Sequence, residues 1–222
     1  IDILLDPMSF HDFFFILISA LFAQAQTYDR AKMWDAEINS LTEIDVRQNP
    51  PKNPVLFVGS SSMRLWRNLR ESFPNLNVIN RGFGGSRLED TNYYFDRIVM
   101  PYNPRIVVLY AGENDINDGI TPEKLANDYK KFAELMHQKL PKAKIIFVSM
   151  KPSPSRWKLA DNFRQANNLI KAEIAKDKRA VFIDVWSAML DAKGEPRPEL
   201  FQADMLHMKE NGYAIWKGLL QK

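Results

Sequence analysis

Five short segments of the 222-residue sequence carry hydroxyl, carboxamide, carboxylate or imidazole side chains, and three of these segments also contain glycine. A serine hydroxyl becomes an effective nucleophile when an imidazole accepts its proton, and a carboxylate on the other ring nitrogen fixes the imidazole tautomer. Backbone N–H groups and carboxamides can stabilise the negative oxygen that such an attack creates. The segments are Gly59–Ser62, Arg81–Ser86, Ala111–Asp115, Lys151–Arg156 and Asp204–His207.

The first four segments each follow an apolar run that has the composition of a buried strand. These runs are continuous and rich in β-branched residues, which is typical of parallel strands covered on both faces. Ligands of an open parallel sheet bind outside the carboxyl ends of its strands, so the segments should meet at one edge of the sheet. The predicted strands are Val55–Val58, Val78–Asn80, Ile106–Tyr110, Lys144–Ser149 and Val181–Asp184.

Helical patterns separate the predicted strands. The stretch Pro122–Leu140 and the stretch from Phe163 to Ile174 both place apolar side chains three and four residues apart. Alternation of strands and helices predicts an α/β domain of three α/β/α layers around a five-stranded parallel sheet. Five strands favour the flavodoxin-like order 2-1-3-4-5.

The first 25 residues resemble a signal peptide or leader. Phe13–Phe22 is an apolar run, and Ala23–Ala25 has the small-x-small form of a cleavage site. No Lys or Arg precedes this run, so a buried helix is the alternative. We expect a leader over 1–25 cleaved near Ala25, an N-terminal helix and Pro-rich connector over 26–54, and the α/β domain over 55–222. A cleaved leader predicts a periplasmic or secreted protein, and otherwise the protein is cytoplasmic.

Composition argues against several classes of protein. The 30 Lys and Arg residues are scattered and the net charge is only +3, so no nucleic-acid partner is expected. The absence of cysteine excludes disulfides and thiolate metal sites, and only three histidines are present, so no metal is expected. No stretch approaches the roughly 20 apolar residues that span a bilayer, so no stable membrane insertion is expected.

Each candidate side chain also has an ordinary structural explanation. Serines at strand ends often cap the next helix, and Ser60 and Ser62 are placed as well for this as Ser61. Gly84 and Asn114 are common turn residues. Arg81, Arg156 and Trp157 could line a pocket, or could form a surface ion pair or pack in the core.

The scarcity of histidine narrows the choice of a base. His11 lies in the leader pattern and His137 lies within a predicted helix, where we expect it to be solvated. His207 is therefore the best-placed imidazole. Asp204 shares a short loop with His207, whereas the competing carboxylate, Asp184, ends the fifth predicted strand.

The order of these segments resembles the SGNH/GDSL family of esterases and acylhydrolases, which includes platelet-activating-factor acetylhydrolase-like members. The resemblance runs from about Val55 to Trp216 and implies an SGNH hydrolase domain over 55–222. Ser60 stands where the best-known members carry Asp, at a position outside the catalytic triad. The matching blocks are Gly59-Ser60-Ser61, Gly82-Phe83-Gly84-Gly85, Gly112-Glu113-Asn114-Asp115 and Asp204-x-x-His207.

By this resemblance Ser61 is the nucleophile, and Asp204 and His207 complete the triad. The same resemblance implies an oxyanion hole formed by Ser61, Gly84 and Asn114. It implies hydrolysis of an acyl ester of a carbohydrate or small molecule, with no cofactor. We expect a short acyl chain such as acetyl, because no long apolar lid segment is present. A lysophospholipase or thioesterase of this fold, and a catalytically silent carbohydrate-binding protein, are the alternatives.

Two other enzyme-like classes fit the sequence poorly. The glycines of Gly82–Gly85 follow a strand but do not form G-x-G-x-x-G, and no G-x-x-x-x-G-K-[ST] loop is present, which argues against a nucleotide-binding domain. An α/β-hydrolase would show G-x-S-x-G around its nucleophile, but Met63 stands where the second glycine belongs.

Overall fold

The computed structural model describes residues 32–221. The predicted leader over residues 1–25, and the first part of the segment predicted over 26–54, lie outside the described residues. The chain divides into two compact units, Ile1–Ala36 and Glu37–Lys222, and all the candidate site residues belong to the second. Among residues 32–221, no helix combines the length and the apolar character needed to cross a membrane.

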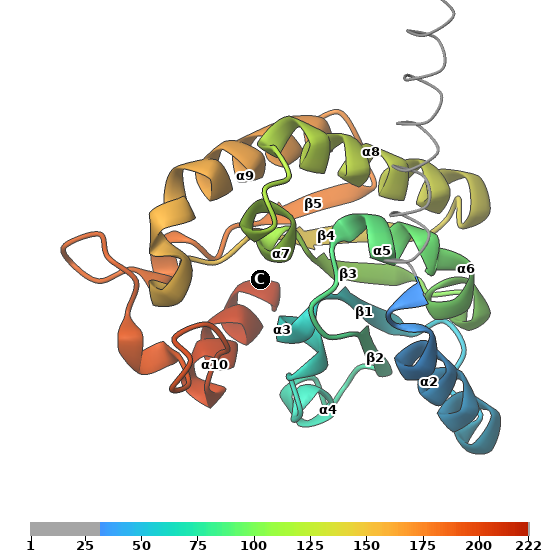
Figure 1. The fold of residues 1–222 in the computed structure, drawn as a ribbon. Helices are drawn as coiled ribbons and strands as arrows, with labels where there is room; N and C mark the ends of the chain where they lie inside the picture. Colours follow the sequence, from blue (N-terminus) through green and yellow to red (C-terminus); the bar gives the residue numbers. More distant parts are fainter. Residues whose placement is uncertain (1–31, 222) are drawn as a thin grey trace, which may run out of the picture. The chain divides into compact units, whose positions relative to one another are not determined.

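Five parallel strands form one sheet in the order β2-β1-β3-β4-β5, shown in Figure 1. The three-layer α/β class and the flavodoxin-like strand order are therefore confirmed. Every strand begins and ends within two residues of its predicted bounds. The strands are β1 (Val55–Gly59), β2 (Val78–Gly82), β3 (Ile106–Tyr110), β4 (Lys144–Val148) and β5 (Ala180–Ile183).

Helices cover both faces of the sheet. In Figure 1, α5 (Leu88–Tyr93), α8 (Pro122–Lys139) and α9 (Ala160–Ile174) lie on one side, and α3 (Ser61–Arg64), α4 (Leu69–Ser72) and α10 (Glu210–Leu220) lie on the other. The remaining helices are α2 (Asp35–Gln48), α6 (Phe95–Ile98) and α7 (Glu113–Asn117). Short 3₁₀ turns are η1 (Met100–Tyr102), η2 (Pro154–Leu159), η3 (Ser187–Met189) and η4 (Pro198–Leu200).

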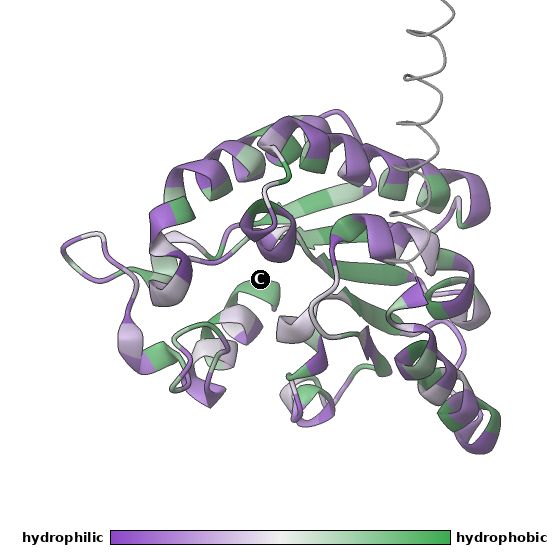
Figure 2. Cartoon of the chain, viewed as in Figure 1, coloured by the Kyte–Doolittle hydropathy of each residue, from purple (hydrophilic) through white to green (hydrophobic). Residues whose placement is uncertain are grey.

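Alternate strand residues pack against the two helical layers, as the period of a β-strand requires. On the α10 side, Phe57 of β1 packs with Trp66, Tyr213 and Trp216 in one apolar cluster. Figure 2 shows apolar residues concentrated in the strands and polar residues on the outer surfaces of the helices. The stripe predicted on α8 is buried, and its members are Leu125, Tyr129, Phe132, Met136 and the adjacent Leu140.

The register brings the carboxyl ends of three strands level. Gly59 at the end of β1 pairs with Gly82 of β2 and with Tyr110 of β3. The loops that leave these strands therefore begin side by side. This is the edge of the sheet at which the sequence predicts the functional side chains.

Candidate active site

Ser61 begins α3 directly after β1. The turn between them requires glycine, because Gly59 has φ +119° and an added Cβ would lie 1.9 Å from the Tyr110 carbonyl oxygen. Ser60 occupies the N-cap position but its side chain makes no capping hydrogen bond. The N–H of Ser61 belongs to the first turn of α3, where no intrahelical acceptor is available.

The structure brings together Ser61, His207 and Asp204. His207 Nε2 lies 3.0 Å from Ser61 Oγ, although 146 positions separate the two residues in sequence. His207 Nδ1 lies 2.6 Å from Asp204 Oδ2. The N–H groups of Leu206 and His207 donate to Asp204 Oδ1 at 3.0 and 2.9 Å. The carboxylate, imidazole and hydroxyl thus form one hydrogen-bonded line.

The pKa of Asp204 is lowered to about 2. Burial acts in the opposite direction and is the largest single effect. The hydrogen bonds from the Leu206 N–H and from the side chain and N–H of His207 together outweigh it. Asp204 is therefore ionised at neutral pH, the state that can orient an imidazole and stabilise its cation.

The other candidates for the imidazole base and its carboxylate partner, His137 and Asp184, have different hydrogen-bond partners. Asp184 Oδ1 accepts the N–H of Trp186 at 2.9 Å and stabilises the turn after β5. His137 Nε2 lies 2.6 Å from Asp177 Oδ2, which links α8 to the segment before β5. The expectation that His137 is simply solvated was wrong, because its ring is only 34% exposed and has a carboxylate partner. His11 is outside the described residues.

Asn114 lies on α7, which follows β3. The preceding Gly112 has φ +120°, and a Cβ there would lie 2.7 Å from Met150 Sδ. Asn114 Nδ2 donates to the carbonyl oxygen of Ser86 at 2.9 Å, so the carboxamide touches the loop after β2. Arg156 Nη2 donates to Asn114 Oδ1 at 3.0 Å.

The loop after β2 offers two glycine N–H groups. That of Gly84 donates to Glu37 Oε2 at 3.4 Å. Gly85 is exposed, has φ +71°, and its N–H has no hydrogen-bond acceptor in the described part of the chain. The assignment of Gly84 to an oxyanion hole stays a prediction, and Gly85 is the neighbouring donor that sequence reasoning did not single out.

A buried charged cluster lies next to these residues. Lys151 is fully buried, and its Nζ lies 2.5 Å from Glu113 Oε2 and 3.3 Å from both Ser62 Oγ and Tyr110 Oη. The Tyr110 hydroxyl also donates to Glu113. Burial lowers the pKa of Lys151, with Glu113 opposing this effect, and burial raises the pKa of Tyr110.

This cluster connects the carboxyl ends of β1, β3 and β4. Ser62 is adjacent to Ser61, and Glu113 is adjacent to Asn114. Sequence reasoning included Lys151 only as part of a loop and gave Glu113 no role. The sequence did contain a signal for the burial of Lys151, since this residue follows a mainly apolar stretch, Ile145–Met150, that is interrupted only by Ser149.

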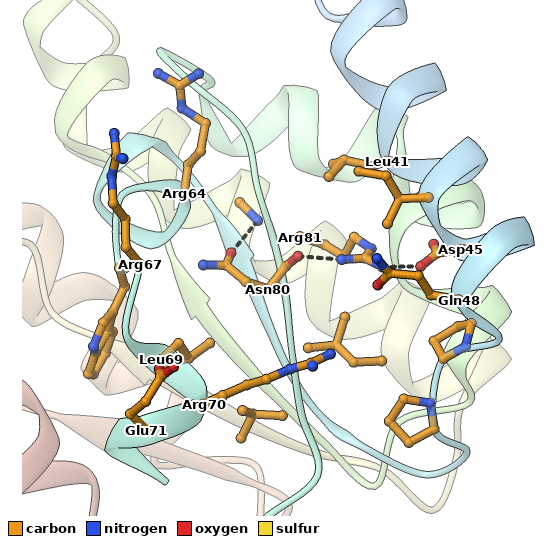
Figure 3. A pocket seen from close by; sticks show the side chains of 17 residues that line it. Leu41, Asp45, Gln48, Arg64, Arg67, Leu69, Arg70, Glu71, Asn80 and Arg81 are labelled. Atoms are coloured by element: carbon orange, nitrogen blue, oxygen red, sulfur yellow. Dashed lines mark hydrogen bonds and ion pairs between the residues drawn. The ribbon is translucent and has the colours of Figure 1, made fainter. Parts of the chain in front are cut away.

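The other residues considered for a pocket lie in two places. Arg81 donates to Asp45 and Tyr102 beside a cavity of about 460 Å³, and Figure 3 shows its guanidinium directed at Asp45. None of the predicted catalytic residues lines this cavity. Arg156 lies beside Asn114, and Trp157 stacks on Trp186 with ring centroids 5.9 Å apart.

Hydroxyl, imidazole and carboxylate side chains meet at this edge of the sheet. Within residues 32–221, no group of three or more His, Cys, Asp or Glu side chains is arranged to hold a metal ion. The hydrogen-bonded hydroxyl, imidazole and carboxylate can activate a nucleophile by proton transfer.

Comparisons with known proteins show the family of the chain. A sequence model of the GDSL-like lipase/acylhydrolase family matches residues 40–215. The human platelet-activating factor acetylhydrolase IB subunit alpha1 is 27% identical over 186 residues, which cover 81% of this chain and 79% of that protein.

Solved structures share the fold. A structure from Streptococcus pneumonia, named for platelet activating factor, has a TM-score of 0.77 and 18% identity, covering 91% of this chain and 97% of that one. A catalytic mutant of an acetylxylan esterase from Geobacillus stearothermophilus has a TM-score of 0.61 and 16% identity, covering 77% and 93%.

Proposed function

The chain belongs to the GDSL-like lipase/acylhydrolase family and is a hydrolase acting on ester bonds, and from this premise we propose that Ser61, His207 and Asp204 are its catalytic triad. The observation that carries the proposal is the hydrogen-bonded line of these three side chains. Both links of this line, at 2.6 and 3.0 Å, are already at hydrogen-bond distance before any substrate is bound, so little rearrangement precedes the reaction.

In the first half of the proposed reaction, Ser61 Oγ attacks the carbonyl carbon of the ester while its proton passes to His207 Nε2. Asp204 stabilises the resulting imidazolium through Nδ1. The tetrahedral intermediate then collapses, the bond to the alcohol oxygen breaks, and His207 returns the proton to that oxygen. The alcohol leaves and the acyl group stays on Ser61.

In the second half, water attacks the acyl carbon and gives a proton to His207 Nε2. The bond to Ser61 Oγ breaks, the carboxylic acid leaves, and the proton returns to Ser61. Both halves pass through an oxyanion. We assign the stabilisation of this oxyanion to the Ser61 N–H, the Asn114 carboxamide and a glycine N–H from the loop after β2. Gly84 is the predicted glycine donor, and Gly85 is the next residue of the same loop.

We propose a short acyl chain, such as acetyl, on a carbohydrate or small molecule. The similar proteins named for an acetyl group, the human acetylhydrolase and the bacterial acetylxylan esterase, support this choice. A series of p-nitrophenyl esters from C2 to C16 tests it, and the highest kcat/KM is expected at C2 to C4. A maximum at C8 or longer would instead support a lysophospholipase or a long-chain thioesterase.

Ser61→Ala tests the nucleophile in the same assay. Turnover of p-nitrophenyl acetate is expected to vanish while the unfolding temperature stays close to that of the wild type. Ser60→Ala is the matched control, since the Ser60 side chain makes no capping hydrogen bond and the hydroxyl that faces His207 Nε2 is that of Ser61. Activity retained in Ser61→Ala, or lost equally in the control, would move the nucleophile elsewhere.

We further propose that residues 1–25 are a leader that is removed before the protein acts in the periplasm or outside the cell. The apolar run and the Ala23–Ala25 pattern support this. Amino-terminal sequencing of the protein recovered from its native compartment tests it. A mature chain that still begins before residue 13 would contradict the proposal.

A further inference from the structure

The Asn114 carboxamide is held at both ends by groups that agree on its orientation. The Ser86 carbonyl can only accept a hydrogen bond, and it faces Nδ2 at 2.9 Å. The Arg156 guanidinium can only donate, and its Nη2 faces Oδ1 at 3.0 Å. Because a carboxamide is nearly symmetrical in shape, partners of this kind decide which end points where.

One hydrogen of the Asn114 amide therefore remains for another partner. A carboxamide nitrogen carries two hydrogens, and Ser86 receives one of them. The structure gives no second acceptor to Nδ2 in the described part of the chain. This second hydrogen is the one that the proposed function assigns to the oxyanion.

The turn that carries Arg156 also contacts the loop of the proposed base. The N–H of Ser155 donates to the Met205 carbonyl at 3.1 Å, and Met205 lies between Asp204 and His207 in sequence. Arg156 itself is half-buried, and its N–H donates to the Ser153 carbonyl at 3.2 Å. The short turn η2 therefore touches both the imidazole loop and the oxyanion side of the site.

We propose that Arg156 is a positioning residue that keeps the Asn114 N–H directed at the reacting carbonyl. A guanidinium on Oδ1 orients the amide, and it also polarises the amide so that its N–H becomes a stronger donor. Arg156 acts through Asn114 and makes no contact with substrate in this scheme. The inference rests on the proposed role of Asn114 as an oxyanion donor.

Steady-state kinetics on p-nitrophenyl acetate test the proposal with Arg156→Met, Asn114→Ala and the double variant. Asn114→Ala is expected to lower kcat by about 10²–10³, the usual loss for one oxyanion donor. Arg156→Met is expected to lower kcat by about 10- to 100-fold, as for a lost hydrogen bond to a charged group. KM should change little, since the lost interaction forms in the transition state.

The double variant is decisive. If Arg156 acts through Asn114, Arg156→Met should have almost no further effect once Asn114 is alanine. Arg156→Lys keeps the charge and one donor, so its kcat should lie between wild type and Arg156→Met. Lys158→Met is the matched control, because it removes an exposed cation from the same turn and should leave kcat unchanged.

Three outcomes would overturn the inference. A wild-type kcat in Arg156→Met, or losses that multiply in the double variant, would show that Arg156 does not act through Asn114. A rise in KM alone would make Arg156 a substrate-binding residue. A wild-type kcat in Asn114→Ala would instead remove the proposed oxyanion role itself, which distinguishes the two failures. Arg156→Gln replaces Arg156→Met if the latter unfolds at a lower temperature.

Discussion

The fully buried Lys151–Glu113 pair gives the sharpest prediction about stability. Lys151→Met removes the ammonium group and leaves the Glu113 carboxylate, which is only 4% exposed, without its cation. Removing one partner of a buried pair costs about 3–5 kcal/mol in the free energy of unfolding. For a domain of this size, 1 kcal/mol shifts the unfolding temperature by about 2–4 °C. The expected decrease is therefore about 6–20 °C.

The double variant Lys151→Met/Glu113→Gln tests whether the lost stability comes from the unpaired charge or from the changed shape of the side chain. It removes both charges and keeps similar volumes, so most of the lost stability should return, because paired buried charges are costly to desolvate. Lys139→Met is the control. It breaks an exposed pair with Asp96, at 2.5 Å, which should contribute less than about 1 kcal/mol.

The pH dependence of the stability of the single variant Glu113→Gln provides a further test. The remaining lysine loses the carboxylate that opposes the effect of burial, so its pKa in the folded state should fall further. The unfolded state then binds more protons than the folded state over the range between the two pKa values, and stability rises with pH there. Unfolding followed by circular dichroism measures all four variants. A double variant as unstable as Lys151→Met would refute the reasoning.

Three further predictions concern single positions. Asp204→Asn should lower kcat by about 10⁴ through loss of the correct imidazole tautomer, whereas Asp184→Asn should not, and the reverse result in ester hydrolysis would exchange their roles. Burial raises the pKa of Asp115 from 3.8 to about 7, so the folded state holds a proton that the unfolded state has lost. Denaturant unfolding should therefore show stability falling by about 2–3 kcal/mol from about pH 5 to about pH 8, and a flat profile for Asp115→Asn. Gly59→Ala should unfold at a much lower temperature than Gly85→Ala, because its Cβ would meet the Tyr110 carbonyl oxygen while Gly85 faces open space.

The strands were predictable because each is buried on both faces and reads as a continuous apolar run. Ile106–Tyr110 was predicted to the residue, and the strand order followed from the number of strands. The approach of Ser61 to His207 was also implied by topology, since both lie at the carboxyl edge of one sheet. Sequence position alone could select Asp204 over Asp184, because Asp204 shares a loop with the only imidazole left for the site.

Other features of the site could not be predicted from the sequence, because they depend on contacts between segments that are far apart along the chain. Lys151 and Glu113 have side chains that are usually solvated, and only the alignment of β1, β3 and β4 encloses them. The contact of Arg156 with Asn114 depends on a turn whose backbone at Arg156, φ −116° and ψ 16°, departs from helical values. The choice between Gly84 and Gly85 as the proposed oxyanion donor depends on Glu37, because the Gly84 N–H donates to this carboxylate, which lies 47 positions earlier in the sequence.

The segment after β4 connects these observations. Lys151 at its start is buried against Glu113, and Arg156 six residues into it reaches the neighbouring Asn114. Two prolines, Pro152 and Pro154, restrict the backbone between the two cations. One short segment therefore places one cation against Glu113 and another against Asn114, which are adjacent residues of α7. A substitution that loosens this segment, such as Pro152→Gly, should lower kcat more than it raises KM. If the segment mainly bound substrate, the same substitution would raise KM more than it lowers kcat.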